Sequence, residues 1–350
     1  MTVAVSFDDV NIVFGDKPET ALTLMDEGKS RAEIQAETGQ VLGVHNCSLD
    51  VNEGDILVLM GLSGSGKSTL LRAVNGLNKV VRGSVRVNRG DRMVDVVSTS
   101  ALELRSIRRS RVAMVFQQFG LLPWRSVADN VGFGLELARV SKNERKERVQ
   151  KQLELVGLSD WANRKVGELS GGMQQRVGLA RAFSTEAPIL LMDEPFSALD
   201  PLIRTRLQDE LLELQTRLKR TIIFVSHDLD EAFKLGDQIA IMEGGRIIQK
   251  GSPRDIYSNP VNDYVADFVQ HMNPLNVLTA RDLMSEPVDQ GSASVDAQAS
   301  LDEIITKFED DVESLRVISD EKLVGTITPK TVLSSLKSIS REKTISDEKS

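Results

Sequence analysis

The sequence contains one cysteine, Cys47, and three histidines in 350 residues. A single cysteine excludes a disulfide within the chain and suits a reducing compartment such as the cytosol. No apolar run approaches the length of a membrane-spanning helix, and the N-terminus lacks a basic segment before an apolar core. We therefore expect neither a transmembrane helix nor a signal peptide. If the protein works on a membrane, a partner must carry the membrane part.

Acidic residues outnumber basic ones, 51 to 43. The formal net charge is −8, which argues against a nucleic acid as the partner. Residues 281–350 hold 15 acidic and nine basic residues, so −6 of the −8 lies in this C-terminal part. The chain is long enough for a full core and predicts more than one domain.

A glycine-rich segment at residues 61–68 fits the pattern G-x-x-x-x-G-K-[ST]. It follows the apolar run 55–60 and precedes a helical stretch from Leu70, the context in which this loop binds phosphate. Its glycines let backbone N–H groups converge on phosphate oxygens, while Lys67 reaches the β- and γ-phosphates and the Ser68 hydroxyl binds Mg²⁺. The predicted contact residues are Gly61, Ser63, Gly64, Ser65, Gly66, Lys67, Ser68 and Thr69.

Polar side chains end two further apolar runs. Residues 189–193 end in Asp193 and Glu194, and residues 221–225 shortly precede His227. Paired acids at a buried strand end are costly unless they bind a cation. We therefore predict that Asp193 holds Mg²⁺ and that Glu194 polarises an attacking water. Ligands of open α/β sheets bind beyond the carboxyl ends of the strands, so His227 is placed to donate to a γ-phosphate.

Two other candidates carry open alternatives. Gln117 follows the apolar run 112–116, and its carboxamide suits Mg²⁺ or a metal-bound water, but Gln118 beside it leaves the choice undecided. Phe14 ends a predicted edge strand at residues 3–14; its ring suits an adenine, whereas its position alone favours a core or edge aromatic.

A serine–glycine segment forms a second candidate anion site. Ser170 is placed to cap a helix, and the glycines after it let a ligand approach the helix start. An ordinary serine-capped helix explains the spacing equally well. The segment consists of Leu169, Ser170, Gly171, Gly172 and Met173.

Two stretches predict helices without evident chemistry. Residues 17–42 interrupt a strand pattern with one short helix ended by Gly28 and a second that begins at the capping box 30–33 and stops at Gly39. A docking or structural role is the default for this hairpin. Residues 118–168 form a more helical region.

In this order, the motifs resemble the ATPase subunits of ABC transporters over roughly residues 3–270. Within this family, the chain more specifically resembles the ATPase subunits of bacterial glycine betaine, choline and proline importers. The segments that carry this resemblance are the hairpin, residues 60–69 and residues 169–182. Met173 stands where the wider family commonly has glutamine. The resemblance assigns a dimer-contact loop to Ser197, Ala198, Leu199 and Asp200.

The fold implied by this resemblance is the α/β P-loop NTPase fold of the ABC type. A nucleotide-binding domain at 1–272 would contain a RecA-like core, an antiparallel β subdomain, and a helical subdomain at 118–168. Residues 276–337 resemble one cystathionine-β-synthase-like (CBS) module, which is α+β. Such modules normally pair, and the sequence fits one module only. The polar residues 338–350 are predicted to be disordered.

The implied activity is ATP hydrolysis that drives import of choline, glycine betaine or proline betaine for osmoprotection or choline uptake. ATP and Mg²⁺ are the implied cofactors, with Mg²⁺ held by Ser68, Gln117 and Asp193, and with Glu194, His227 and Gln117 as catalytic residues. Phe14 would stack on the adenine, and the 169–173 segment of a second subunit would contact the ATP.

The resemblance also implies partners and a location. They are a second identical subunit, membrane permease subunits, and a periplasmic or extracellular binding protein, with the ATPase on the cytoplasmic face of the inner membrane. The solute cannot be read from a subunit that does not touch it; the single-module tail slightly favours choline.

Two other functions compete with this interpretation. An ABC ATPase of DNA repair would need a long heptad insertion between Lys67 and Ser170, and that interval has no sustained heptads. A nucleotide-binding regulator without turnover would have no use for Glu194 and His227.

Overall fold

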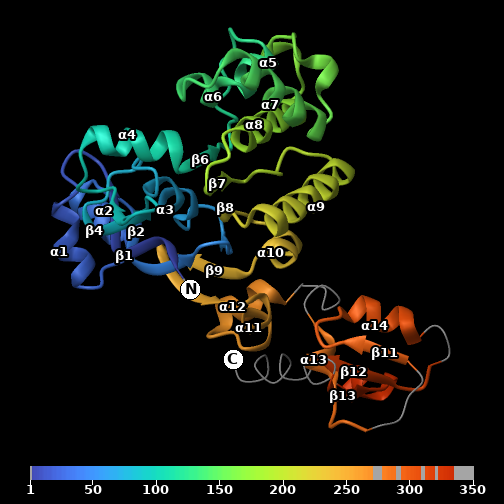
Figure 1. Ribbon diagram of the computed structural model, residues 1–350. Coiled ribbons are helices and arrows are strands. Elements are labelled where there is room, and N and C mark those ends of the chain that lie inside the picture. Colours follow the sequence, from blue (N-terminus) through green and yellow to red (C-terminus); the bar gives the residue numbers. More distant parts are fainter. Residues whose placement is uncertain (1, 271–277, 289–292, 309–311, 320–321, 335–350) are drawn as a thin grey trace. The chain divides into compact units, whose positions relative to one another are not determined.

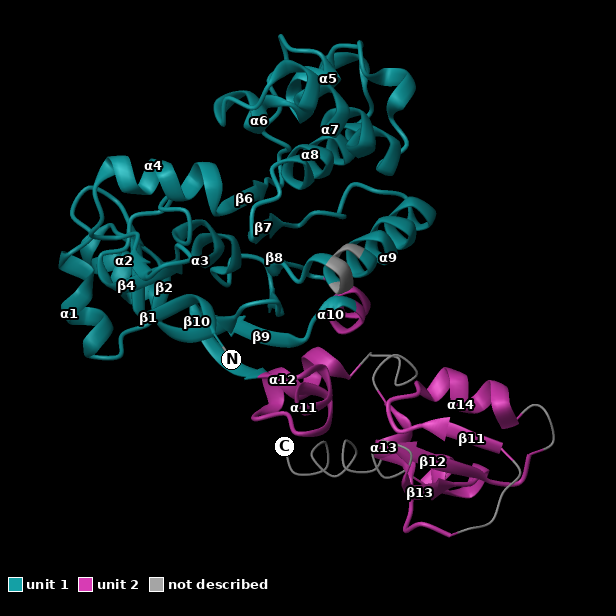
Figure 2. Ribbon diagram, viewed as in Figure 1, with its two compact units in different colours: residues 1–227, 235–250 teal, residues 228–234, 251–350 magenta. Residues whose placement is uncertain are grey.

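Figure 1 shows the computed structural model, which describes residues 2–270, 278–288, 293–308, 312–319 and 322–334. The chain divides into two compact units (Figure 2). The first comprises residues 1–227 and 235–250, and the second residues 228–234 and 251–350. The structure thus groups residues 251–270 with the C-terminal part of the chain. Residues 338–350, predicted to be disordered, lie outside the described residues.

The first unit is built around a six-stranded sheet whose central strands are buried on both faces. Each of the pairs β3–β9, β3–β8, β8–β7 and β7–β6 is parallel. Every residue of β3, β7 and β8 is buried, which explains why these strands appear in the sequence as unbroken apolar runs. The strand order is β10 (Arg246–Gly251), β9 (Gln238–Glu243), β3 (Ile56–Met60), β8 (Thr221–Val225), β7 (Ile189–Asp193) and β6 (Val112–Val115).

A second sheet of the same unit is antiparallel. Its order is β2 (Val41–Asn52), β1 (Val3–Phe14), β4 (Arg82–Asn88) and β5 (Met93–Asp95). Helices α3 (Lys67–Ala73) and α4 (Ala101–Ser110) contribute to one hydrophobic core with both sheets. This shared core fixes the phosphate loop, which joins β3 to α3, against the antiparallel sheet. Core residues include Val5, Ile12, Val44, Leu59, Leu70, Leu71 and Ile107.

The predicted hairpin is present as α1 (Thr20–Asp26) and α2 (Arg31–Thr38). Ser30 caps α2 in the predicted capping box with Glu33, and Gly39 ends the helix at φ 67°. The hairpin has a small core of its own that joins it to β1 and β2. That core consists of Ala21, Met25 and Ile34 packed with Val13 and Leu42.

The helical region follows β6 and lies together in space (Figure 1). It consists of α5 (Val127–Val131), α6 (Phe133–Leu137), α7 (Lys142–Leu155), two short 3₁₀ turns (Ser159–Trp161 and Val166–Glu168) and α8 (Gly171–Ser184). Helix α8 contacts α5, α6 and α7 and also β6, so it connects this region to the main sheet. The long helix α9 (Pro201–Leu218) then leads into β8. Among the described residues, no helix is both long and apolar enough to span a membrane.

The second unit contains α10 (Leu229–Leu235) in large part, α11 (Pro253–Ser258), α12 (Asp263–Val269) and a small α+β element. That element has a three-stranded sheet in the order β11 (Ala293–Asp296), β12 (Leu315–Ser319), β13 (Lys322–Ile327). Strands β11 and β12 are parallel and are connected through α14 (Leu301–Phe308), whereas β12 and β13 are antiparallel neighbours. Helix α13 (Ala280–Leu283) packs on β13.

Candidate functional site

The phosphate loop between β3 and α3 is packed so closely that two of its glycines are obligatory. A Cβ at Gly61 would lie 2.1 Å from the Met242 carbonyl oxygen, and one at Gly66 would lie 2.6 Å from the Gly43 carbonyl oxygen. Both glycines also have positive φ, 137° and 102°. Any side chain at either position would therefore displace the loop from β2 or β9.

Lys67, the first residue of α3, lies folded against this loop. Its Nζ donates hydrogen bonds to the carbonyl oxygens of Gly61 at 2.7 Å and Leu62 at 2.9 Å. Burial lowers the pKa of Lys67, an effect that the charges of Glu194 and Asp193 oppose. The ammonium thus lies within the loop, among acceptors that a phosphate oxygen would supplement.

A cavity of about 630 Å³ opens above the loop, within the size range of small-molecule sites. Ten of the residues predicted from the sequence line it, although they come from five separate parts of the chain. Arg31 lines it too and was not predicted. The predicted lining residues are Phe14, Ser63, Gly64, Gly66, Lys67, Ser68, Thr69, Gln117, Glu194 and His227.

Three of these side chains meet at the carboxyl ends of parallel strands. Gln117 Nε2 donates to Glu194 Oε2 at 3.0 Å, and His227 Nδ1 lies 3.8 Å from the same oxygen. Gln117 lines the cavity and Gln118 does not, so the geometry favours the first of the two glutamines that the sequence left open. Phe14 is 43% exposed on the cavity wall, which is not the environment of a core aromatic.

Asp193 lies beneath the cavity and is fully buried. Its Oδ2 accepts hydrogen bonds from Arg72 Nε at 3.1 Å and Nη2 at 2.7 Å, while its Oδ1 is buried without a hydrogen-bond partner. An orphaned carboxylate oxygen is rare in a protein interior and fits a bound cation or its water. The residue set therefore fits Mg²⁺, and the Arg72 pairing is a contact that sequence reasoning missed.

Glu194 has an unusual backbone conformation, φ +50°, which non-glycine residues seldom adopt. Its carbonyl oxygen accepts from Gln175 Nε2 at 3.0 Å and from Ser197 Oγ at 3.1 Å. Gln175, almost fully buried in α8, also accepts from the Ala198 N–H at 3.0 Å. This glutamine connects α8 to the acidic turn, and no motif in the sequence indicates that role.

The serine–glycine segment lies elsewhere on the surface of the first unit. Ser170 caps α8 and accepts from the Met173 N–H at 3.4 Å; its side chain and Gly171 are exposed. Leu169 is buried, and Gly172 and Met173 are half-buried. None of these residues lines the cavity of their own chain.

The predicted dimer-contact loop follows the acidic turn. Ser197 and Ala198 are exposed, Leu199 is buried, and Asp200 caps α9 by accepting from the Ile203 N–H at 3.1 Å. The exposed Ser197 and Ala198 are therefore accessible on the surface of the first unit.

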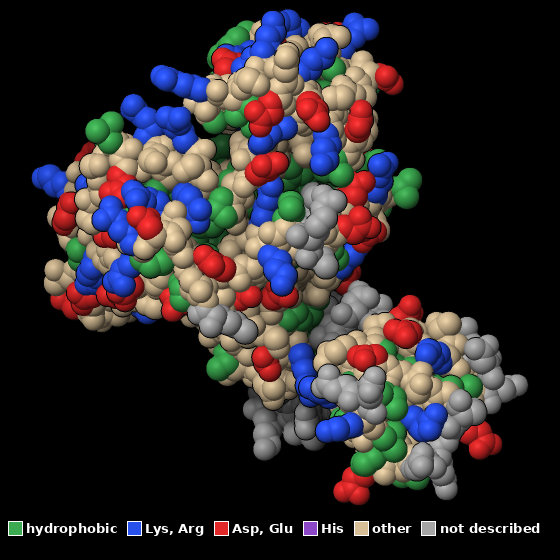
Figure 3. All heavy atoms as spheres, in the orientation of Figure 1, with side chains coloured by type: hydrophobic (Ala, Val, Ile, Leu, Met, Phe, Trp, Pro, Cys, Tyr) green, Lys and Arg blue, Asp and Glu red, His purple; other side chains and the backbone are tan. Residues whose placement is uncertain are grey.

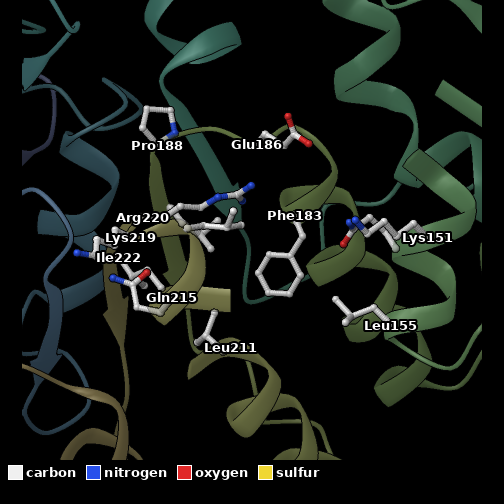
Figure 4. Close-up of a pocket in the computed structure, with 13 residues that line it drawn as sticks. Lys151, Leu155, Phe183, Glu186, Pro188, Leu211, Gln215, Lys219, Arg220 and Ile222 are labelled. Atoms are coloured by element: carbon white, nitrogen blue, oxygen red, sulfur yellow. The ribbon is translucent and has the colours of Figure 1, made fainter. Parts of the chain in front are cut away.

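A second cavity, of about 460 Å³, lies among α7, α8, α9 and the neighbouring strands β7 and β8 (Figure 4). Phe183, Leu211 and Ile222 form its apolar wall, with Lys151 and Arg220 among its polar residues. None of the residues predicted from the sequence lines it. Over the visible face of the first unit, basic and acidic side chains are interspersed (Figure 3).

Comparison with known proteins gives a consistent result. The family model described as ABC transporter matches residues 44–197. The chain is 48% identical over 283 residues to the glycine betaine/proline betaine transport system ATP-binding protein of Escherichia coli K12, covering 81% of this chain and 70% of that protein. It is 42% identical over 316 residues to the trimethylamine N-oxide transport system ATP-binding protein of Ruegeria pomeroyi, covering 90% and 92%.

A solved structure is also similar. It is a dimeric ATP-binding cassette in a post-hydrolysis state with ADP and phosphate bound. Its TM-score to this chain is 0.62 at 29% identity, covering 71% of this chain and 99% of the other. The expected ABC-type fold is confirmed by this similarity.

The buried pair of Asp193 and Arg72 generates a stability prediction. Arg72→Ala leaves the fully buried Asp193 carboxylate without its partner, so we expect the free energy of unfolding to fall by about 2–3 kcal/mol. This loss is smaller than that for a wholly buried pair, because the Arg72 side chain is 37% exposed. Urea denaturation measures it. Arg86→Ala removes the exposed pair with Asp8 and should cost less than about 1 kcal/mol. Equal losses in the two variants would contradict the prediction, whereas adding Asp193→Asn to Arg72→Ala should recover stability.

Proposed function

The chain belongs to the family of ABC transporter ATP-binding subunits, and we propose that it hydrolyses ATP to drive import of a quaternary ammonium compound through a partner permease. The observation that carries the proposal is the single cavity that collects the phosphate loop, Gln117, Glu194 and His227. The names of its relatives, which belong to glycine betaine, proline betaine and trimethylamine N-oxide systems, support the substrate class.

In the proposed binding mode, the adenine stacks on Phe14 and the phosphates lie over residues 61–69. Lys67 neutralises phosphate charge from within the loop. Ser68, Gln117 and Asp193 would hold Mg²⁺, which would offset the negative charge of the phosphates. The orphaned Oδ1 of Asp193 supports this assignment.

Glu194 is the proposed acceptor of a proton from the attacking water. Its Oε2 already receives the Gln117 amide, which leaves the other oxygen to orient a water molecule. His227 lies beside the same carboxylate and is 66% exposed, so its ring is available to donate to the γ-phosphate. The strained backbone of Glu194, fixed by Gln175 and Ser197, holds the carboxylate at this point.

The site is proposed to be completed by a second copy of the chain. The 169–173 segment carries an exposed Ser170 and does not line its own cavity, and the similar solved cassette is a dimer. We infer that Ser170, Gly171 and Gly172 of one subunit contact the nucleotide of the other, with Ser197 and Ala198 at the contact.

The remaining partners follow from the transport role. The loop from Gln117 to Trp124 is the proposed contact with the permease, and Trp124 is 69% exposed there. A periplasmic or extracellular binding protein would deliver the solute, and the ATPase would lie on the cytoplasmic face of the inner membrane. Glycine betaine, proline betaine and choline all fit the proposal.

The C-terminal element is proposed to be a single CBS-like module at residues 276–337. The order β11, α14, β12, β13, with a parallel first pair and an antiparallel second pair, supports this proposal. Control of transport is its proposed role.

Glu194→Gln tests the hydrolytic assignment. The amide keeps the shape of the side chain but accepts no proton, so we expect ATP binding to persist and steady-state hydrolysis in the assembled transporter to fall about 100-fold or more. Glu186→Gln is a matched control, because Glu186 also has a positive φ of 54° and does not line the cavity above the phosphate loop. Hydrolysis close to wild type in Glu194→Gln would remove Glu194 from the mechanism.

Ser170→Arg tests the two-subunit site. A bulky cation at an exposed position should leave ATP binding by the monomer intact while it blocks ATP-dependent dimerisation and hydrolysis. Light scattering with and without ATP, beside a phosphate-release assay, measures both. Hydrolysis that continues without dimers would show that one chain suffices.

Truncation after Gln270 tests the role of the C-terminal part. All the nucleotide motifs precede it, so the truncated protein should fold and support transport with an altered salt response. The −6 charge of residues 281–350 is screened over about 10 Å at 0.1 M salt. Transport in proteoliposomes across a salt series compares the two proteins. Loss of all ATPase activity would assign the tail a structural role, and identical salt profiles would deny it a regulatory one.

A further inference from the structure

The helical hairpin of residues 17–42 reaches the phosphate loop through one side chain, Arg31. Its Nη1 donates to the Gly64 carbonyl oxygen at 2.7 Å, and its Nη2 donates to the Gly43 carbonyl oxygen at 2.7 Å. One guanidinium therefore bridges the phosphate loop and strand β2. Lysine has no planar fork of donors and would not hold these two carbonyl oxygens in the same fixed geometry.

Arg31 is a cation without an acid beside it. Across the described residues, no carboxylate lies within ion-pair distance of its guanidinium, and its Nε is buried without a hydrogen-bond partner. Burial lowers the pKa of Arg31. Desolvating a charge without an opposite charge nearby is costly. The two hydrogen bonds to carbonyl oxygens offset part of this cost for the Arg31 guanidinium.

The surroundings hold Arg31 in place. It is the first residue of α2, whose start is fixed by the Ser30–Glu33 capping box. Asp26 of α1 accepts from Arg82 Nη1 of β4 at 2.8 Å and anchors the hairpin from its other helix. Gly245 leaves room for the guanidinium, because a Cβ there would lie 2.9 Å from Arg31 Nη2.

The bond to Gly64 controls the orientation of one peptide group in the loop. In a trans peptide the C=O and the N–H point in opposite directions. With the Gly64 carbonyl directed to Arg31, the Ser65 N–H is directed the other way, where it donates to the Leu62 carbonyl at 3.2 Å. Nothing lies within 4 Å of a Cβ built on Gly64, so no packed side chain covers this glycine, and the Arg31 bond is the contact recorded for its carbonyl oxygen.

From this geometry we propose that Arg31 is a positioning residue for nucleotide binding, and that the hairpin sets nucleotide affinity by clamping the Gly64–Ser65 peptide. The inference rests on the nucleotide site proposed above and assigns the hairpin a role within it. Arg31 acts through the loop backbone, which must present its N–H groups to the phosphates in one arrangement.

The test compares the full-length chain with Arg31→Ala, Arg31→Lys and Asp26→Ala. Asp26→Ala is the matched control, because it loosens the hairpin from β4 without touching the phosphate loop. Calorimetric titration with ADP measures affinity. Hydrogen exchange without nucleotide measures protection of loop residues 62–66 and of α2 separately.

We expect Arg31→Ala to bind ADP about tenfold more weakly than wild type, the equivalent of about 1.4 kcal/mol. Its loop amides should exchange faster while the α2 amides stay protected. Arg31→Lys should fall between Arg31→Ala and wild type, because it keeps the charge but not the fixed fork of donors. Asp26→Ala should bind ADP within about twofold of wild type.

The outcomes separate this inference from the proposed function. If wild type does not bind ADP, the nucleotide site fails, and the exchange of the empty loop still tests the clamp. If Arg31→Ala matches wild type in affinity and in loop exchange, the clamp is wrong. If Arg31→Ala also unfolds α2, Arg31→Lys becomes the deciding variant. If α2 stays intact in Arg31→Lys and this variant matches wild type in ADP affinity and loop protection, the inference is overturned.

Discussion

The close approach of the phosphate loop to two backbone carbonyls is the constraint on which the site depends. Gly61 passes the Met242 carbonyl of β9 and Gly66 passes the Gly43 carbonyl of β2, each at a distance that excludes a side chain. These contacts join the parallel sheet, the loop and the antiparallel sheet at one point. Because protein interiors are close-packed, a shift of the loop would have to move both sheets. The position of Lys67 and of the cavity above it follows from this packing.

The chemistry of the site then comes from the direction of the strands. Strands β6, β7 and β8 are parallel neighbours, so their carboxyl ends bring Gln117, Glu194 and His227 to one edge. Beneath that edge Asp193 is held by Arg72, and Glu194 is turned into the cavity by a strained backbone whose carbonyl is bonded to Gln175. Two neighbouring acids thus have different environments, one buried with an arginine and the other facing the cavity.

Much of this could be predicted from the sequence, because local signals specified it. Apolar runs gave β3, β7 and β8, a capping box gave the start of α2, and the glycine spacing gave the phosphate loop. Arg31, Arg72 and Gln175 could not be predicted in this way. Their partners lie 33, 121 and 19 residues away in the chain, and their contacts exist only once the hairpin, α3 and α8 have packed. Phe14 shows the same limit, since only the folded chain exposes its ring on the cavity wall.

The exposure of Glu194 and His227 bears on the proposal that two copies of the chain form the site. The Glu194 side chain is 21% exposed and that of His227 is 66% exposed, so bulk water reaches both in the single chain. Electrostatic stabilisation of a phosphoryl transfer is strong only where a surrounding surface excludes that water. The cavity has the phosphate loop and the strand ends as its walls, and no residue of the 169–173 segment contributes to it. This exposure supports the proposal that the exposed serine–glycine segment of a second copy covers the nucleotide and excludes water from Glu194 and His227.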